Sequence, residues 1–231
     1  MSDQIVILTG AGISAESGLG TFRDEGGLWA QHRIEDVATP EGFARDPALV
    51  HRFYNMRRAE AARAAPNPAH DALARLQRDW PGKVVIITQN VDGLHEKAGA
   101  NVLHMHGALA TALCAACGHR WDSPAEMAPG DPCPVCHRAA ARPDIVWFGE
   151  MPYHMDEIED HLLACDLFAA IGTSGQVYPA AGFVREARNA GARTVEMNLR
   201  DSDTSHAFDD HLVGPASRIV PEWVDGLLAG R

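Results

Sequence analysis

The chain has 231 residues, of which 46% are hydrophobic and 22% are charged. This length and composition fit a globular protein with one large core and a smaller appended module. The apolar runs are too short to span a bilayer, the net charge is −11, and no Lys/Arg run occurs, which argues against a membrane span and a broad nucleic-acid surface. The N-terminal residues lack the pattern of a secretory signal, so we expect a cytoplasmic protein.

The first predicted element is a short strand, Ile5–Leu8, that runs into the glycine turn Gly10-Ala11-Gly12. Glycines let the backbone approach a ligand closely, and the N-terminus of a following helix favours a phosphate. A dehydrogenase would also need an acidic residue at the end of a second strand roughly 20 residues further on. Residues 26–40 contain no strand-like run, and Glu35 and Asp36 lie in a helix-like segment. The loop therefore predicts a nucleotide-binding site, but not a dehydrogenase that transfers a hydride.

Similar apolar runs recur along the chain with helical stretches between them, which predicts an α/β fold with a doubly wound, Rossmann-like parallel sheet. The expected strands are Ile5–Leu8, Val84–Ile87, Leu167–Ile171 and Thr194–Met197. The expected helices are Glu41–Ala65, His70–Asp79, Asp156–Ala164 and Ala180–Ala190. In such a sheet, ligands bind at the carboxyl ends of the strands, where glycine and short polar residues follow in this sequence.

Two regions interrupt the alternation of strands and helices. Residues 32–69 look helical and end in Pro66-Asn67-Pro68, where we expect a hinge, while residues 108–142 are rich in Cys, Pro and Gly. We therefore expect a smaller domain, made of a helical module (32–69) and a zinc-binding module (108–142). The Rossmann-like domain then comprises residues 1–31, 70–107 and 143–231.

Two C-x-x-C pairs, separated by fifteen residues, have the spacing of a zinc ribbon. The four candidate ligands are Cys114, Cys117, Cys133 and Cys136. Two disulfides are uncommon inside cells, and neither pair opens a long helix as a redox pair would. Because four thiolates leave no open position, we expect a structural Zn²⁺. His119 and His137 are close enough to compete as ligands, but we expect them on the surface.

Six motifs now occur in one order: GAGISAESGLGTFR, TQNVDGLHEKAG, HMHG, the two cysteine pairs, WFGEMP and the GTS loop. Over essentially its whole length, the chain resembles the sirtuins, which are NAD-dependent protein lysine deacylases. The stretches HRFYNMRR and GTSGQVYPAAGF are similar to the class III, CobB-type bacterial members. The resemblance implies that NAD⁺ is consumed as a co-substrate and that the zinc takes no part in the chemistry.

The resemblance also implies which residues bind NAD. Phe22 would shield the reactive ribose, Asp92 would hold the nicotinamide carboxamide, and Gln89 and Asn90 would contact the ribose and an ordered water. Taken without the family, Asn90 or Asp92 serves equally well as a cap for the segment from Gly93. The full expected set is Gly10, Ala11, Gly12, Ser14, Glu16, Thr21, Phe22, Arg23, Trp29, Gln89, Asn90, Val91, Asp92, Gly172, Thr173, Ser174, Asn198, Leu199, Arg200 and Ala216.

His106 and Asn90 are the expected catalytic residues. A neutral imidazole, with an ordinary pKa of about 6.5, accepts a proton near neutral pH. Spacing does not choose between His106 and His104, which share one face of an extended segment, whereas the His-Gly pair of the family chooses His106. In the implied reaction, the acyl-lysine oxygen attacks C1′ of the nicotinamide ribose and expels nicotinamide. His106 then helps deprotonate a ribose hydroxyl that attacks the imidate, and water completes the release of lysine and O-acyl-ADP-ribose.

Tyr54 and Arg57 are spaced i, i+3 on an expected helix, so a phenol and a guanidinium fork project from one face. The resemblance implies that they recognise the carboxylate of succinyl- or malonyl-lysine, with deacetylation alongside. The alternative from the residues alone is a core-facing Tyr beside a solvated Arg. The expected contacts to the substrate peptide are Val146, Phe148, Gly149, Glu150, Val177 and Tyr178, some of which could instead serve interdomain packing.

Two other functions use the same features. The first is ADP-ribosyl transfer, in which a protein side chain or water captures the ribose at the same NAD site. The second is a zinc-ribbon binding module with a vestigial nucleotide loop, although the polar residues at several strand ends weigh against it. The expected partners are the acylated lysine side chains of proteins, with no nucleic acid and no membrane, bound by a monomer.

Overall fold

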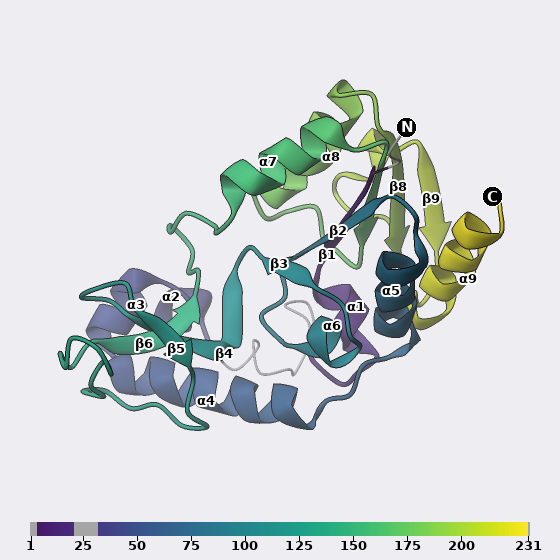
Figure 1. Ribbon diagram of the computed structural model, residues 1–231. Helices are drawn as coiled ribbons and strands as arrows, with labels where there is room; N and C mark the ends of the chain where they lie inside the picture. Colours follow the sequence, from purple (N-terminus) through teal and green to yellow (C-terminus); the bar gives the residue numbers. More distant parts are fainter. Residues whose placement is uncertain (1–3, 21–31, 231) are drawn as a thin grey trace.

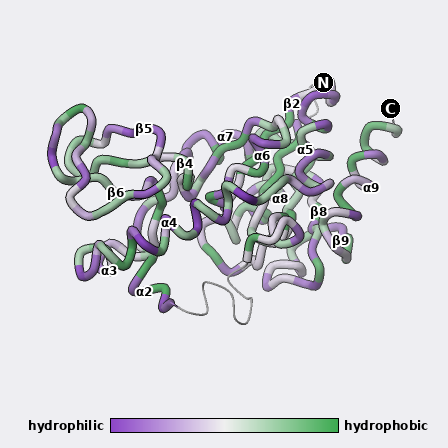
Figure 2. Tube along the Cα trace, turned by 90° about the horizontal axis from the view of Figure 1, so that it is seen from below, coloured by the Kyte–Doolittle hydropathy of each residue, from purple (hydrophilic) through white to green (hydrophobic). Residues whose placement is uncertain are grey.

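The computed structural model describes residues 4–20 and 32–230, which form two lobes (Figure 1). A six-stranded parallel sheet with helices on both faces makes up the larger lobe, which confirms the predicted doubly wound α/β fold. The smaller lobe combines a three-stranded antiparallel sheet with a group of helices. Figures 1 and 2 both place the small sheet at one end of the molecule and the strands β8 and β9 at the other.

The large sheet has the strand order β3-β2-β1-β7-β8-β9, so the chain leaves the central strand β1 first toward one edge and later toward the other. The switch point between β1 and β7 is where a doubly wound sheet opens a crevice for ligands. The strands are β1 (Gln4–Thr9), β2 (Lys83–Thr88), β3 (Val102–His104), β7 (Leu167–Ile171), β8 (Arg193–Asn198) and β9 (Asp210–Val213).

Helices cover both faces of this sheet because alternate residues of each strand point to opposite sides. Ile5 and Ile7 of β1 pack with α5 and α9, whereas Val6 and Leu8 pack with α7 and α8. Burial on both faces explains why the strands are continuous apolar runs in the sequence. The helices of this lobe, including two single 3₁₀ turns, are α1 (Ala11–Ala15), α5 (Pro68–Asp79), α6 (Leu94–Lys97), α7 (Met155–Ala164), η2 (Ala180–Gly182), α8 (Phe183–Asn189), η3 (Ser205–Ala207) and α9 (Ala216–Ala229).

The small lobe is held together by its own core. Phe53 and Tyr54 of the longest helix, α4, pack against Leu109 and Ile145 of the small sheet. Its helices and strands are α2 (Ile34–Val37), α3 (Pro40–Arg45), α4 (Pro47–Arg63), β4 (Gly107–Cys114), β5 (Arg120–Asp122) and β6 (Ala141–Ile145). This packing joins the helices of residues 32–63 to the cysteine-rich segment.

The single helix expected over Glu41–Ala65 is instead two helices, α3 and α4. Asp46 ends the first and caps the second, because its carboxylate accepts a hydrogen bond from the Leu49 N–H at 2.9 Å. Pro47 follows at the first position of α4, where its missing N–H costs no helical hydrogen bond.

The segment expected as a hinge is firmly anchored. Asn67 is 7% exposed and caps α5, and its side-chain amide donates to the Ile13 carbonyl at 2.8 Å and to Ser17 Oγ at 3.0 Å. The link between the two lobes is therefore tied to helix α1 and the turn that follows it. Among residues 4–20 and 32–230, no helix has both the length and the apolar content of a membrane span.

Candidate functional site

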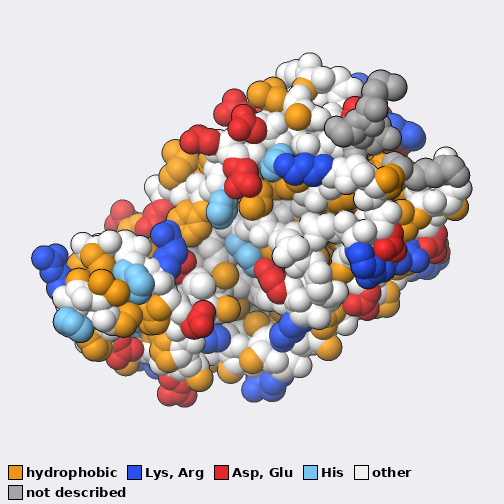
Figure 3. Space-filling model, viewed as in Figure 1, with side chains coloured by type: hydrophobic (Ala, Val, Ile, Leu, Met, Phe, Trp, Pro, Cys, Tyr) orange, Lys and Arg blue, Asp and Glu red, His pale blue; other side chains and the backbone are white. Residues whose placement is uncertain are grey.

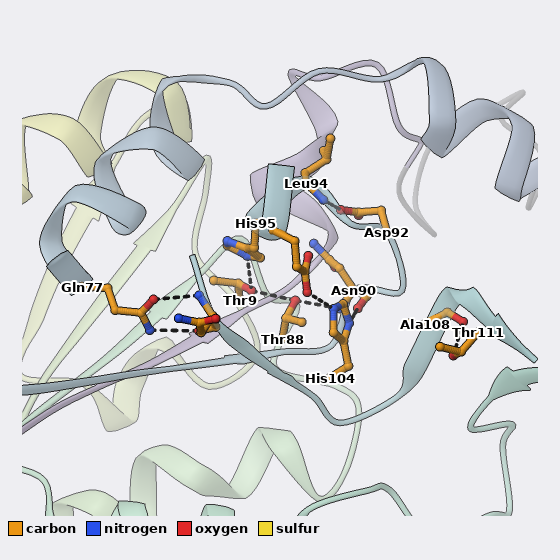
Figure 4. A network of polar contacts seen from close by, with 12 residues as sticks. Thr9, Gln77, Thr88, Asn90, Asp92, Leu94, His95, His104, Ala108 and Thr111 are labelled. Carbon is orange, nitrogen blue, oxygen red and sulfur yellow. Dashed lines mark hydrogen bonds and ion pairs between the residues drawn. The ribbon is translucent and has the colours of Figure 1, made fainter. Parts of the chain in front are cut away.

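The carboxyl ends of β1, β2, β7 and β8 bring together four loops that lie far apart in the sequence. These loops contain most of the expected NAD-binding residues that the structure describes. Figure 4 shows the polar network behind the β2 loop. Thr21, Phe22, Arg23 and Trp29 lie outside the described residues.

The glycine turns after β1 and β7 pack directly against each other. The Gly10 N–H donates to the Ile171 carbonyl at 2.9 Å, and the Gly12 N–H donates to the Gly172 carbonyl at 2.8 Å. A Cβ on Gly12 would lie 2.7 Å from Gly172 Cα, and Gly172 itself has a φ of +63°. Glycine is thus required here for contact between two loops, in addition to any approach of a ligand.

Asn90 and Asp92 occupy the centre of the site, at the end of β2. The Asn90 amide donates to the Gly10 carbonyl at 3.0 Å and to Ser14 Oγ at 3.1 Å, and Ser14 Oγ in turn donates to Asp92 at 3.1 Å. Asp92 also accepts the Leu94 N–H at 3.0 Å. One Asp92 oxygen therefore forms a turn with the first residue of α6, whose N-cap is Gly93 rather than Asn90 or Asp92, while the other oxygen faces Ser14. Asn90, Asp92 and Ser14 are all buried, as is Val91 between them.

A second polar chain links the loops after β2, β7 and β8. Gln89 donates from its side-chain amide to Thr173 Oγ1 at 3.2 Å, and Asn198 donates to the Thr173 carbonyl at 2.7 Å. Ser174 follows Thr173, and its carbonyl accepts the Asp203 N–H at 3.2 Å. Gln89, Thr173 and Asn198 thus meet at the carboxyl ends of the strands β2, β7 and β8.

His106 stands just before β4, where the chain passes from the large sheet to the small one. Its Nδ1 lies 3.1 Å from the Gln89 carbonyl, which can only accept, so Nδ1 carries the proton and Nε2 keeps a lone pair. Burial lowers the pKa of His106 below its ordinary value, and the bond to Gln89 offsets part of that effect. The imidazole is therefore neutral at neutral pH, with the tautomer that a general base needs.

His104 is in a different state. Its Nδ1 lies 2.9 Å from the Asn90 carbonyl and its Nε2 lies 2.6 Å from the Glu96 carboxylate, so both nitrogens face acceptors. Burial lowers the pKa of His104, but Glu96, the Asn90 carbonyl and Asp92 together more than offset this and leave the pKa above the ordinary value. The geometry thus separates two histidines that sequence spacing leaves equivalent.

Tyr54 and Arg57 lie on α4 beside the small-lobe core. Tyr54 is 1% exposed, and its phenol oxygen accepts a hydrogen bond from Trp147 Nε1 at 3.0 Å. Arg57 is half-buried, with its guanidinium carbon 5.9 Å from the Tyr54 ring centroid. The core-facing Tyr of the alternative interpretation is therefore observed, but the fully solvated Arg is not. Burial lowers the pKa of Arg57, and the nearby carboxylates of Asp92 and Glu60 offset only part of this effect.

The segment after β6 is a tight turn. The Val146 N–H donates to the His106 carbonyl at 2.9 Å, and Gly149 has a φ of +92°. The Glu150 carboxylate accepts from Arg142 at 2.7 Å and from the Trp147 N–H at 2.8 Å, so this side chain holds the turn. Of the two aromatic residues here, Trp147 is buried, whereas Phe148 is 46% exposed.

The remaining expected residues lie in surface loops or at helix ends. Tyr178 is 72% exposed and Val177 is partly buried, in the loop that leads into η2. Leu199 is 69% exposed, and Arg200 is also exposed, directly after β8. Ala216 begins α9, where the Glu16 carboxylate accepts the Ser217 N–H at 3.0 Å. Glu16 and Ala216 therefore lie at one junction between α1 and α9.

The four cysteines of the small lobe converge on one point. Their sulfur atoms all lie within 4.8 Å of one another, with 3.6 Å between Cys114 and Cys136 and 3.8 Å between Cys117 and Cys133. Four Zn–S bonds of about 2.3 Å in a tetrahedron place sulfurs about 3.8 Å apart, so the set fits a zinc ion. The ring of His119 stacks on Trp121 instead of joining the cluster, and His137 is also not part of it.

Several residues around the site have no role in the expectations drawn from the sequence. Thr9 and Thr88 end the neighbouring strands β1 and β2, and their hydroxyls hydrogen-bond each other at 2.9 Å behind the site. Glu96 sets the charge of His104, and Arg142 anchors Glu150. The sequence could have indicated Thr9 and Thr88, because each is a polar residue at the end of an apolar strand. Nothing in the neighbouring sequence indicates Glu96 or Arg142.

Comparisons with known proteins agree with this geometry. A model of the Sir2 family matches residues 10–179. A Bdellovibrio bacteriovorus protein named NAD-dependent protein deacylase is 58% identical over 228 residues, covering 97% of this chain and 96% of that protein. A solved complex of a Sir2 homologue with NAD is 38% identical, has a TM-score of 0.91 and covers 99% and 91% of the two chains. A Sir2 homologue variant bound to 2′-O-acetyl ADP-ribose is also 38% identical, with a TM-score of 0.90 and coverage of 99% and 93%.

Proposed function

This chain belongs to the Sir2 family, and on that premise we propose that it is an NAD-dependent protein lysine deacylase. The reaction removes acetyl and acidic acyl groups, such as succinyl and malonyl, from lysine side chains of proteins. Its products are the free lysine, nicotinamide and O-acyl-ADP-ribose. The similarity to a Sir2 homologue bound to 2′-O-acetyl ADP-ribose supports the last of these products.

The observation that carries the proposal is the state of His106. Its Nδ1 proton is bound to the Gln89 carbonyl, and its Nε2 has no hydrogen-bond partner among the described residues. A neutral imidazole fixed in this tautomer is ready to take a proton from a ribose hydroxyl at Nε2. His104 lacks such a lone pair because both of its nitrogens face acceptors.

The chain offers suitable groups for NAD, which supplies an electrophilic ribose carbon when bound. Asn90 and Asp92 are buried polar side chains at the switch point of the sheet, where a nucleotide is expected. The remaining contacts come from the residues expected from the sequence, including Thr21, Phe22, Arg23 and Trp29. Asn90 orients the reacting groups, and the other contacts bind and position the co-substrate.

The acyl chain lies toward Tyr54 and Arg57. The Tyr54 phenol is neutral and retains its own proton for donation. Arg57 is a cation and interacts electrostatically with Asp92 in the NAD site. One neutral donor and one guanidinium form a suitable site for a terminal carboxylate. An acetyl group needs neither residue, which is why deacetylation accompanies removal of acidic acyl groups.

The peptide backbone of the substrate lies along residues 146–150, with residues 177 and 178 on the opposite side. Phe148 and Tyr178 are the exposed apolar side chains of these segments and are available to a peptide. Glu150 acts through the shape of the turn, since its carboxylate is engaged by Arg142. In this proposal, residues 32–69 and 108–142 form the smaller domain, and the zinc ion there is structural.

Mass spectrometry tests the proposal with acetyl-lysine and succinyl-lysine peptides of identical sequence, incubated with NAD and the protein. Loss of the acyl group, with nicotinamide and acyl-ADP-ribose appearing together, is the expected result. The variant His106→Ala should abolish turnover of both peptides. ADP-ribose found on protein, with both peptides unchanged, would instead establish the transferase alternative.

A further inference from the structure

A buried chain of polar groups runs behind the candidate site, from α6 to the end of β2 (Figure 4). His95 Nε2 lies 3.1 Å from Thr9 Oγ1, and Thr9 Oγ1 donates to Thr88 Oγ1 at 2.9 Å. Thr88 Oγ1 then accepts the Asn90 N–H at 3.0 Å. Thr9, Thr88 and His95 are all 1% exposed or less, so water does not compete for these bonds.

The chemistry of each group fixes the direction of this chain. Because Thr9 gives its only hydroxyl proton to Thr88, it can only accept from His95. His95 must therefore carry its proton on Nε2 and a lone pair on Nδ1. Burial, with smaller effects from His70 and His104, lowers the pKa of His95 to about 3, so the ring is neutral.

His70 packs against His95 from the α5 side. Its Nδ1 accepts the Asn67 N–H at 3.3 Å, so the proton of this neutral ring lies on Nε2. Burial lowers the pKa of His70 as well. The two rings lie 4.9 Å apart, centroid to centroid, in an edge-to-face contact, and neither His70 Nε2 nor His95 Nδ1 has a hydrogen-bond partner in the described chain. The first nitrogen carries a proton and the second a lone pair, so the two rings match in polarity although no hydrogen bond joins them.

The far end of the chain reaches the residues that hold the proposed base. The Gln89 N–H donates to the Thr9 carbonyl at 2.9 Å, and the Gln89 carbonyl accepts the Nδ1 proton of His106. The Asn90 N–H is bound to the Thr88 hydroxyl. The backbone that fixes the tautomer of His106 is therefore fastened on both sides by Thr9 and Thr88.

We propose that His95 and Thr9 are positioning residues, which hold the Gln89–Asn90 backbone in the geometry that gives His106 its basic tautomer. Neither residue is among those assigned to NAD, substrate or zinc. The inference rests on the proposed function in one respect: the consequence for catalysis requires that His106 acts as the base. The hydrogen-bond directions in the chain stand independently of that role.

The first test uses Thr9→Val, which removes the hydroxyl and keeps the shape, with Thr9→Ser as the matched control that keeps the hydroxyl. Thr9→Val should lower kcat by about tenfold or more, while KM for the peptide changes little. A displacement of a catalytic group by about 1 Å can cost roughly a hundredfold in rate, which sets the upper end of this expectation. Thr9→Ser should retain most of kcat. A purely structural role would lower the melting temperature of Thr9→Val and leave kcat unchanged below it, which would overturn the proposal.

The second test needs no variant and no activity. Long-range ¹⁵N–¹H NMR correlations in the unaltered protein should place the proton of His95 and of His70 on Nε2, and that of His106 on Nδ1. A proton on Nδ1 of His95 would overturn the chain. The two possible failures are distinguishable: an unaltered protein inactive on every acyl peptide contradicts the proposed function, whereas an active protein with equal kcat in Thr9→Val and Thr9→Ser contradicts the positioning role.

Discussion

The indole nitrogen of Trp147 donates a hydrogen bond to the phenol oxygen of Tyr54 over 3.0 Å, within the core of the small lobe. Since Tyr54 accepts this bond, its own proton remains to be donated to a ligand. Burial raises the pKa of Tyr54 to about 12, so the phenol stays neutral at physiological pH. Trp147 itself follows the end of β6, and this contact ties the peptide-binding turn of the proposal to the helix that carries Arg57.

Replacing Arg57 with Met should therefore change acyl preference. Hydrogen bonds to a charged group are worth about 1.5–3 kcal/mol, so we expect kcat/KM for a succinyl-lysine peptide to fall by roughly 10- to 150-fold. The acetyl-lysine peptide has no carboxylate to lose, and its kcat/KM should change only a few-fold. Steady-state kinetics on the two peptides measure the ratio.

Arg58→Met is the matched control on the same helix. Arg58 donates to the Leu109 carbonyl at 2.9 Å and to Asn55 at 2.8 Å, so it joins α4 to the small sheet. Its loss should lower the melting temperature and affect both peptides equally. Equal losses for the two peptides in Arg57→Met would remove the carboxylate assignment.

The features of the fold that could be predicted from the sequence have local signals. The run Ile5–Leu8 is apolar throughout because both faces of its strand are buried, and the cysteine spacing alone identifies the zinc-site candidates. The strands β3 and β9 are three and four residues long and mix polar with apolar residues, so their pairing depends on distant neighbours. Helix α9 was missed because Pro221 lies inside it, where a proline normally marks a boundary.

For the candidate site, the residue types could be predicted from the sequence, but the protonation states of the histidines and the contacts between the loops could not. Spacing leaves His104 and His106 equivalent, and the main difference between them is the carboxylate of Glu96, which reaches His104 from α6. The glycines at positions 10 and 12 were expected for ligand approach, yet their neighbour is Gly172, about 160 residues away in the chain. Such contacts between distant segments have no signature in either segment alone.

Removal of zinc should unfold the cysteine-rich segment. We expect one zinc per chain by elemental analysis, and Cys133→Ser, at a fully buried ligand, should lose the metal together with activity. His137→Ala is the control, since His137 is outside the sulfur cluster, and it should keep both. Zinc retained at full stoichiometry in Cys133→Ser, but lost in His137→Ala, would contradict the four-cysteine assignment.

Gly172→Ala should disrupt the contact between the two glycine turns. A Cβ there would collide with the backbone of Gly12 and Ile13, which cannot move aside as a side chain can, and the φ of +63° adds about 1–2 kcal/mol. Gly191→Ala has a similar φ of +97° but open space around the added Cβ. We expect Gly172→Ala to bind NAD at least about tenfold more weakly in calorimetry, and Gly191→Ala to bind it normally. Equal binding by the two variants would show that the turns do not need this contact.

The pH dependence of activity should identify which histidine is the base. A general base acts in its deprotonated form, so kcat/KM falls as the pH drops below its pKa. Burial lowers the pKa of His106, which places this acid limb below the ordinary value of about 6.5, whereas Glu96 raises the pKa of His104 above its ordinary value. Measured at saturating NAD, the limb should therefore lie below that value. The acid limb should also stay at the same pH in Glu96→Gln, because this substitution removes the carboxylate beside His104 and leaves the contacts of His106 unchanged. A limb above that value that moves down in Glu96→Gln would transfer the role of base to His104.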